Sequence, residues 1–256
     1  MPDIIVLIRQ HLYNGLIDWQ YCKSGGYMNN REAQFIAKQT MNFIKKNITP
    51  GMKLAQIRKM CEDKMMALGA DSFWYWNVGA FVFSGNETTK SISGKVYKTS
   101  DRCIKMNDIV TIDLSPQCNH IWGDYARTII IEDGHVIEDI NYIQNAEWKA
   151  GLLMELRLHR ELLEYADDKT TFEDLFYHMN TRIISEDFVN LDFLGNLGHS
   201  IEKRSEDRIY IEKGNRTRLS DIPYFTFEPH ISRPHSLYGY KHENIYYFEK
   251  GKLKVL

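Results

Sequence analysis

Four carboxylates and one imidazole in this chain lie in short stretches rich in apolar residues. They are Asp113 in VTIDLSP, Asp124 in WGDYARTIII, His199 in LGNLGHSIE, Glu228 in YFTFEPHI and Glu243 in KHENIYYF. Burying a lone charge costs free energy, so groups in such settings favour a shared cation. Carboxylate oxygens with one imidazole suit Mn²⁺, Fe²⁺, Co²⁺ or Zn²⁺. Five such side chains are enough for two ions about 3.5–4 Å apart.

Asp113 and Asp124 fall on two expected strands, 108–116 and 124–134. If these strands pair antiparallel, the two side chains become near cross-strand neighbours, whose Cβ atoms lie about 4.5–5.5 Å apart. Two buried carboxylates at that separation raise the pKa of one of them sharply. The pair therefore shares a proton or binds a cation. Solvated surface acids are the alternative, and the apolar segments IVTIDLSP and YARTIIIE argue against it.

The elements that must position these residues form two similar halves. In the first half, helices are expected over 31–47 and 53–68, followed by strands at 73–85, 108–116 and 124–134. Apolar residues at helical spacing mark the buried faces of the two helices: Ile36, Thr40, Phe43 and Ile44 in the first, and Leu54, Ile57, Cys61, Met65 and Leu68 in the second.

The second half repeats this plan. A helix is expected over 140–166, with one apolar face formed by Ala146, Ala150, Leu153, Leu156 and Leu163. A helix over 171–185 opens with the capping-box pattern Thr170-x-x-Glu173. Three strands, at 193–200, 223–231 and 241–249, complete the half. We therefore expect an α+β fold with a single domain over 29–256, preceded by a lead-in segment over 1–28.

The composition excludes several classes of protein. The chain of 256 residues has 32 Lys and Arg against 34 Asp and Glu, which favours neither nucleic acid nor an anionic membrane as partner. No apolar run reaches the length of a membrane-spanning helix, and the N-terminus lacks the basic region of a secretory signal. The four cysteines have no CxxC spacing. Reduced thiols in a cytoplasmic protein are the expectation.

Four motifs resemble those of one enzyme family, the pita-bread (M24-type) metallopeptidases, which comprise methionine aminopeptidases, Xaa-Pro aminopeptidases and prolidases. NDIVTIDLSPQCNHIWGDYARTI resembles the family segment G-D-x-V-x-x-D-x-G … D-x-x-R-T, and LGHSIE resembles G-H-G-I-G. FTFEPHI resembles F-T-I-E-P-G-I, and YGYKHENIYYF resembles the closing F-G-x-R-x-E-D. The resemblance implies a pita-bread fold, in which pseudo-twofold helix–helix–strand halves surround a curved antiparallel sheet.

The same resemblance implies roles for the five residues. Asp113 would chelate one of two divalent ions (Mn, Co, Fe or Zn), Asp124 and Glu243 would bridge both, and His199 and Glu228 would complete the second site. A metal-activated water would attack an amide carbonyl, with Glu228 as proton shuttle. The expected partner is a peptide or small peptide-like substrate, without nucleic acid or membrane, and the expected state is a monomer or homodimer.

The sequence also departs from the family pattern. Family peptidases have two substrate-holding histidines, but the segment 90–103 contains none, and the position seven residues after His199 is Glu206. The pattern's glycines are replaced by Glu202 and His230. His230 and His235, in HISRPH, are the foremost candidate catalytic substitutes; the other candidates are Lys95, Tyr97 and Lys203. Two alternatives remain: an inactive pita-bread binding protein, or a non-peptide C–N or C–O hydrolase on the same scaffold.

Two further segments have open interpretations. The run FWYW at 73–76 is either a core strand with Trp74 and Trp76 on one face, which we favour, or the lining of a substrate pocket. The charged stretch 202–216 is either a solvated loop or hairpin, or the rim of a lid over the site.

Overall fold

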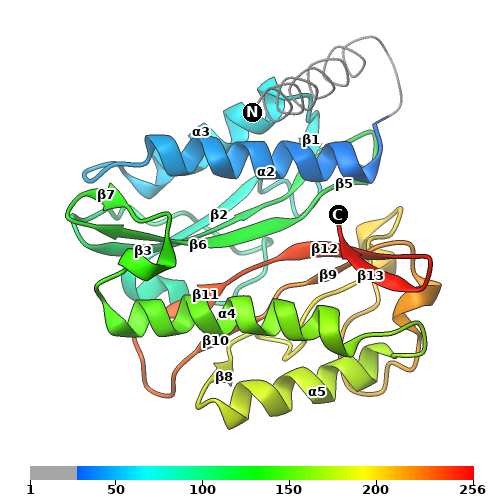
Figure 1. Ribbon diagram of the computed structural model, residues 1–256. Coiled ribbons are helices and arrows are strands. Elements are labelled where there is room, and N and C mark those ends of the chain that lie inside the picture. The colour runs from blue at the N-terminus through cyan, green and yellow to red at the C-terminus, as the bar shows by residue number, and fades with distance from the viewer. Residues whose placement is uncertain (1–27) are drawn as a thin grey trace, which may run out of the picture.

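The computed structural model describes residues 28–256, so the lead-in expected over 1–28 lies almost wholly outside the described residues. Figure 1 shows two helices, α2 and α3, on one side of the molecule and two others, α4 and α5, on the opposite side, with strands between them. The α+β class is confirmed. None of the helices in the described part is long and apolar enough to cross a membrane.

The first half runs from α2 (Asn30–Asn47) to β7 (His135–Val136). The elements between them are α3 (Leu54–Ala67), β1 (Ser72–Phe73), β2 (Ala80–Ser84), β3 (Asp108–Leu114), β4 (Pro116–Cys118), β5 (Ile121–Trp122) and β6 (Tyr125–Glu132). The Asn29 side chain accepts hydrogen bonds from the first turn of α2, and Glu32 completes a capping box. The expected apolar stripe of α3 is buried through Leu54, Ile57, Cys61 and Met65.

The second half contains α4 (Ala146–Tyr165) and α5 (Phe172–Ser185). Its strands are β8 (Val189–Asn190), β9 (Phe225–Phe227), β10 (His230–Ser232), β11 (Gly239–Lys241), β12 (Asn244–Glu249) and β13 (Lys252–Val255). The capping box of α5 uses Thr171 and Asp174, one residue later than the expected pair. The apolar face expected for α4 was wrong, because Leu153, Leu156 and Leu163 are exposed.

The buried face of α4 is instead formed by a mixture of large, small and polar side chains: Trp148, Gly151, Met154, Glu155, Leu158, His159 and Leu162. Gly151 is required here, because a Cβ at this position would lie 2.2 Å from the ring of Tyr240. The helix therefore presents polar groups inward, so a count of apolar residues alone selects the wrong face.

An antiparallel sheet of order β2-β3-β6-β7 joins the two halves. Its side chains alternate between faces. Val110 and Ile112 enter the core beneath α2 and α3, whereas Ile109 and Ile130 enter the core that contains α4 and α5. Asp113 shares the alternation of Ile109, so it faces the second half. In the second half, smaller sheets have the orders β11-β10-β8 and β13-β12-β9.

Hydrogen bonds connect β6 to the segment between β11 and β12. The Thr128 hydroxyl accepts from the backbone N–H of Lys241 at 2.8 Å, and the backbone N–H of Glu243 donates to the Ala126 carbonyl at 3.0 Å. Arg127 donates through Nη1 to the Glu243 carbonyl at 2.6 Å. This seam brings carboxylates from both halves of the chain to one place.

Two expected strands are shorter than the sequence pattern indicates. The segment 193–200 forms only isolated bridges, in which His199 pairs with Tyr210 and Ser200 with Phe225. The aromatic run at 73–76 is not a core strand, because only Phe73 belongs to a strand and Trp76 is 58% exposed. Trp76 and Asn77 have positive φ, so the backbone turns there.

Candidate metal centre

The five candidate ligands come from five separate segments that meet at the seam. Asp113 is in β3, Asp124 directly precedes β6, and His199 lies in the bridge to Tyr210. Glu228 directly follows β9, and Glu243 directly precedes β12. Asp113 pairs with Ala126 across the β3–β6 ladder, so Asp124 lies only two residues beyond its cross-strand partner.

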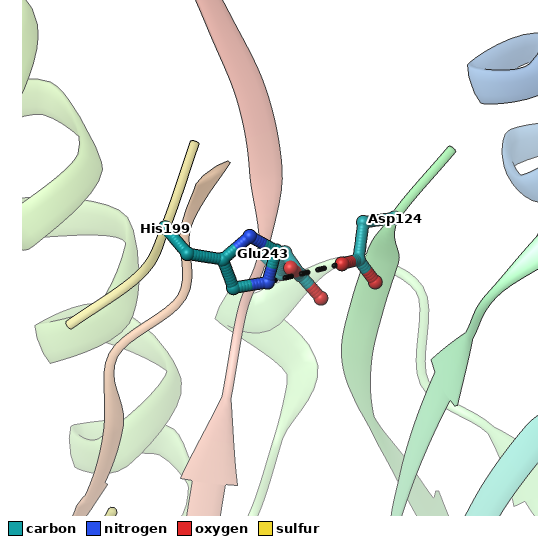
Figure 2. Close-up of side chains that lie close together, drawn as sticks. All are labelled: Asp124, His199 and Glu243. Carbon is teal, nitrogen blue, oxygen red and sulfur yellow. Dashed lines mark ion pairs between the residues drawn. The ribbon is translucent and has the colours of Figure 1, made fainter. Parts of the chain in front are cut away.

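These side chains form two groups that share Glu243. In the first ligand group, the ligand atoms of Asp124, His199 and Glu243 all lie within 4.8 Å of one another. The same limit holds for the second ligand group, Asp113, Glu228 and Glu243. Figure 2 shows the first group, in which the imidazole of His199 and the carboxylate of Asp124 point toward each other from different segments.

His199 connects the two groups. Its Nε2 atom lies 3.5 Å from Oδ2 of Asp124 and 3.4 Å from Oε1 of Glu228. Its Nδ1 atom donates to the Ser200 carbonyl at 3.0 Å, which leaves Nε2 directed at the carboxylates. In metal-binding histidines, a hydrogen bond from the ring nitrogen that does not bind the metal fixes the orientation of the imidazole.

The backbone beside His199 is also constrained. Gly198 has a φ of +143°, and a Cβ there would lie 2.3 Å from the Thr226 carbonyl oxygen. The N–H of His199 donates to the Thr226 hydroxyl at 3.0 Å. The glycine thus lets the segment approach β9 closely enough to present the imidazole.

The carboxylates of Glu243 and Asp124 are buried beside other acidic groups. Both carboxylate oxygens of Glu243 are buried and have no hydrogen-bond partner among the described residues. Burial, together with the charges of Asp124 and Glu228, raises the pKa of Glu243 well above its usual value. Burial also raises the pKa of Asp124 to about 7, and the Asp113 charge adds to this while His199 opposes it. An orphaned carboxylate between two acidic neighbours fits a bound divalent cation.

Among the described residues, Lys241 of β11 is the lysine or arginine whose charged group pairs with carboxylates of the ligand groups, and it was not among the residues expected at the site. Its Nζ atom lies 2.5 Å from Oδ2 of Asp113 and 2.9 Å from Oε2 of Glu228. Although burial opposes ionisation, the charges of Lys241 and His199 lower the pKa of Glu228. The pattern F-G-x-R-x-E-D has a basic residue at this position, but a lysine in a strand usually indicates a surface position, so no contact with the carboxylates was expected.

Comparison with known proteins identifies the family. The model of metallopeptidase family M24 matches residues 29–250, which is most of the chain. The chain belongs to this family. No curated protein sequence matches it.

Solved structures similar to this M24 chain have the same fold. The X-Pro aminopeptidase of Thermotoga maritima MSB8 is 20% identical with a TM-score of 0.70, and the prolidase of Pyrococcus horikoshii OT3 is 21% identical with a TM-score of 0.71. In both matches 87% of this chain is covered, but only 58% and 59% of the respective relatives. The pita-bread fold is thereby confirmed, and the chain spans less than two thirds of these relatives' length.

A cavity of about 130 Å³ opens beside the two ligand groups of the M24 chain. One of its walls is aromatic and includes Trp74, Tyr75 and Tyr210. Trp74 and Tyr75 belong to the run FWYW, so the interpretation of that run as a core strand was wrong and the pocket alternative is the one that fits. Trp74 packs edge-on to the His199 ring at 5.6 Å between centroids.

Arg208 is the cationic side chain on this aromatic wall, and it was not among the residues expected at the site. Its guanidinium carbon lies 4.7 Å from the centre of the Trp74 ring and 5.6 Å from that of Tyr210. Its Nε donates to the Ser205 carbonyl at 2.5 Å. No carboxylate among the described residues forms an ion pair with it, so its remaining N–H groups are free to bind a ligand. No sequence motif includes Arg208, and only its contacts with the aromatic rings distinguish it from a surface arginine.

The candidate substitutes for the missing histidines are placed differently from one another. His230 lines the cavity, and its Nε2 donates to the Thr88 carbonyl at 2.7 Å. Burial lowers the pKa of His230 to about 4, so the neutral ring uses its single proton in that bond. His235 is exposed in the turn between β10 and β11 and does not line the cavity.

The remaining candidate positions lie away from the cavity lining. The Tyr97 hydroxyl accepts from the Val82 N–H at 2.8 Å, inside a small apolar cluster. Lys95 lies over the Trp76 ring, and Lys203 is exposed. Glu206 pairs with Arg204 at 3.4 Å on the surface. The position that carries a histidine in the family pattern therefore faces solvent in this M24 chain.

Behind the candidate metal centre, α4 buries a further carboxylate. Glu155 is 2% exposed, and neither carboxylate oxygen has a hydrogen-bond partner among the described residues. Burial raises the pKa of Glu155 well above its usual value, and the positive charges of Lys241 and Arg127 offset only part of this. The folded protein therefore holds a proton on Glu155 that the unfolded chain releases at lower pH.

This difference predicts a pH dependence of stability. A carboxyl group with a raised folded-state pKa stabilises the fold below its unfolded pKa, near 4.5, and the contribution is lost as pH rises. Between pH 5 and 8 we expect the free energy of unfolding of Glu155→Gln to fall less than that of the wild type. The wild type should show the steeper fall, because only its Glu155 side chain releases a proton on unfolding in this pH range. Urea denaturation of metal-free protein measures it.

The matched control is Glu164→Gln in the same helix, since the Glu164 side chain is 70% exposed. This control should follow the wild-type curve. Equal slopes for all three proteins would contradict the prediction.

Proposed function

We propose that this M24 chain is a divalent-metal-dependent peptidase that hydrolyses an amide bond near the free N-terminus of a peptide or small peptide-like substrate. The observation that carries the proposal is the convergence of two three-residue ligand groups on one buried carboxylate, Glu243, beside a cavity. The titles of the similar structures, an X-Pro aminopeptidase and a prolidase, agree with this class of reaction.

Asp124, His199 and Glu243 would hold a metal ion in one position, and Asp113 and Glu228 form a second cation position together with Glu243. A bound divalent ion would supply an activated water and polarise the substrate carbonyl. Binding of two ions, and their identity as Mn, Co, Fe or Zn, stay predictions from the sequence. Membership of a metal-dependent family and the unpartnered oxygens of Glu243 support the use of a divalent metal.

Glu228 is suited to move a proton. Its Oε2 is held by Lys241 at 2.9 Å, while its Oε1 faces His199 at 3.4 Å. Burial alone would raise the pKa of Glu228, but Lys241 and His199 lower it. The carboxylate therefore stays ionised and can accept a proton at Oε1. It would then pass that proton to the leaving amine.

Arg208 is suited to hold the substrate in place of the absent histidines. Its guanidinium is fixed against Trp74 and Tyr210, so little side-chain freedom is lost when it binds. Its N–H groups would donate to a substrate carbonyl or carboxylate oxygen, and the ring of Trp74 would cover the substrate backbone. His230 would contribute shape and an acceptor atom, Nδ1, to the same wall.

A second candidate function is hydrolysis of a non-peptide C–N bond at the same centre. The observation that favours it is the replaced wall: Arg208 and aromatic rings line the cavity, whereas Glu206 faces solvent. A library of dipeptides and tripeptides, with Met-Xaa and Xaa-Pro members, alongside small amides and amidines, separates the two. Turnover of the amides or amidines alone would support this candidate over a peptidase.

Asp124→Ala tests the metal-dependent reaction. We expect turnover of the best library substrate to fall at least about 10³-fold, because the variant removes a buried ligand that the reaction requires. Bound metal, measured by inductively coupled plasma mass spectrometry, should fall with it. Asp207→Ala is the control, since Asp207 pairs with Arg204 on the surface. Full activity of Asp124→Ala would contradict the proposal, as would activity of the wild type that resists chelators.

Arg208→Ala tests the substrate wall. Loss of a charged donor to the reacting oxygen costs about 10²–10³ in rate in comparable sites, so kcat/KM should fall by about that factor. Metal content should be unchanged, because Arg208 contacts no candidate ligand directly. Arg204→Ala, at a side chain 65% exposed, should keep wild-type kinetics. A kcat/KM within about twofold of wild type for Arg208→Ala would remove Arg208 from the substrate site.

A further inference from the structure

The two ligand groups differ in the positive charge that the protein itself supplies. In the second group, the Lys241 ammonium contacts Asp113 at 2.5 Å and Glu228 at 2.9 Å. Two of the three carboxylates of that group are thus already paired. Within the described part of the chain, neither carboxylate oxygen of the shared member, Glu243, has a hydrogen-bond partner.

The first group has no such cation. Among residues 28–256, no basic side chain except the imidazole of His199 forms an ion pair or hydrogen bond with the carboxylate of Asp124 or Glu243, and the Arg127 guanidinium reaches only the backbone carbonyl of Glu243. Asp124 and Glu243 are 4% and 0% exposed, so water does not solvate them either. A bound cation would therefore stabilise the first group more than the second.

Lys241 is fixed in its position. Its backbone N–H donates to the Thr128 hydroxyl at 2.8 Å, and its carbonyl accepts from that hydroxyl at 3.1 Å. The side chain is 19% exposed, and it points from the end of β11 into the carboxylates. The backbone of Lys241 is therefore held in place, and its ammonium is part of the candidate site.

Lysine at this place differs chemically from the arginine of the pattern F-G-x-R-x-E-D, which aligns with Lys241. An arginine spreads its charge over a planar fork and reaches further, whereas a lysine ammonium is a compact point charge with three donors. A divalent ion in contact with Asp113 and Glu228 would lie within a few ångströms of this ammonium. In a buried site the repulsion between them is poorly screened.

We propose that the Lys241 ammonium fills one of the two cation positions, so that the chain binds a single divalent ion, at Asp124, His199 and Glu243. The inference rests on the proposed metal-dependent function, but it makes its own claim about number and position. The ammonium balances the charges of Asp113 and Glu228, and its N–H groups are presented to the cavity where a second ion would otherwise stand.

The test is the number of ions bound per chain. Full-length protein is freed of metal with a chelator, the chelator is removed, and Co²⁺ is titrated by calorimetry, with bound metal counted by mass spectrometry. The wild type should bind one ion. Lys241→Met, which keeps the length of the side chain and removes its charge, should bind two.

Two further variants keep the test decisive. Lys90→Met is the matched control, because Lys90 also lines the cavity but its ammonium pairs with Glu87 at 2.7 Å, and it should bind one ion. Asp113→Asn should still bind one ion, at an affinity within about threefold of the wild type. If Lys241→Met does not fold, as judged by circular dichroism, the wild type and Asp113→Asn decide the question.

Two ions in the wild type would overturn the inference, as would one ion in folded Lys241→Met or loss of an ion in Asp113→Asn. Two ions with chelator-sensitive hydrolysis would leave the proposed function intact and remove only this inference. No bound ion in the wild type would remove both.

Discussion

Repulsion among buried and half-buried carboxylates is the physical constraint on which this structure depends. Asp113 and Asp124 come from the first half of the chain, and Glu228 and Glu243 from the second, and all four meet at the seam. Such a cluster is unfavourable in a low-dielectric interior unless cations compensate it. The ammonium of Lys241 supplies part of the compensation. The carboxylate oxygens of Glu243 have no hydrogen-bond partner among the described residues, so the protein does not compensate their charge directly.

The hydrogen bonds that join the two halves at the seam also position residues of the candidate site. Hydrogen bonds from Thr128 and Arg127 of β6 hold the segment that carries Lys241 and Glu243. The two helix pairs lie on the outside of the strands that form this seam (Figure 1). The fold of this M24 chain therefore brings the candidate ligands together at the seam, and Arg208 and Trp74 line the cavity beside them.

Sequence reasoning succeeded where local pattern and chain order decide the geometry. Strand alternation and antiparallel pairing were enough to bring Asp113 near Asp124, and the convergence of all five candidate ligands agrees with the order of the motifs. It failed where tertiary packing decides. The inward face of α4 carries Glu155 and His159, so apolar periodicity selected the exposed side. In the sequence, Lys241 and Arg208 look like surface residues, because their carboxylate and aromatic partners are distant along the chain.

The central claim is that a divalent ion binds between the two halves at Asp124, His199 and Glu243. Anomalous scattering from crystals grown with Zn²⁺ tests this most directly. The account predicts a strong peak about 2.0–2.2 Å from the donor atoms of these three residues. A map without a peak at that place, or with its strongest peak outside the seam, would contradict it.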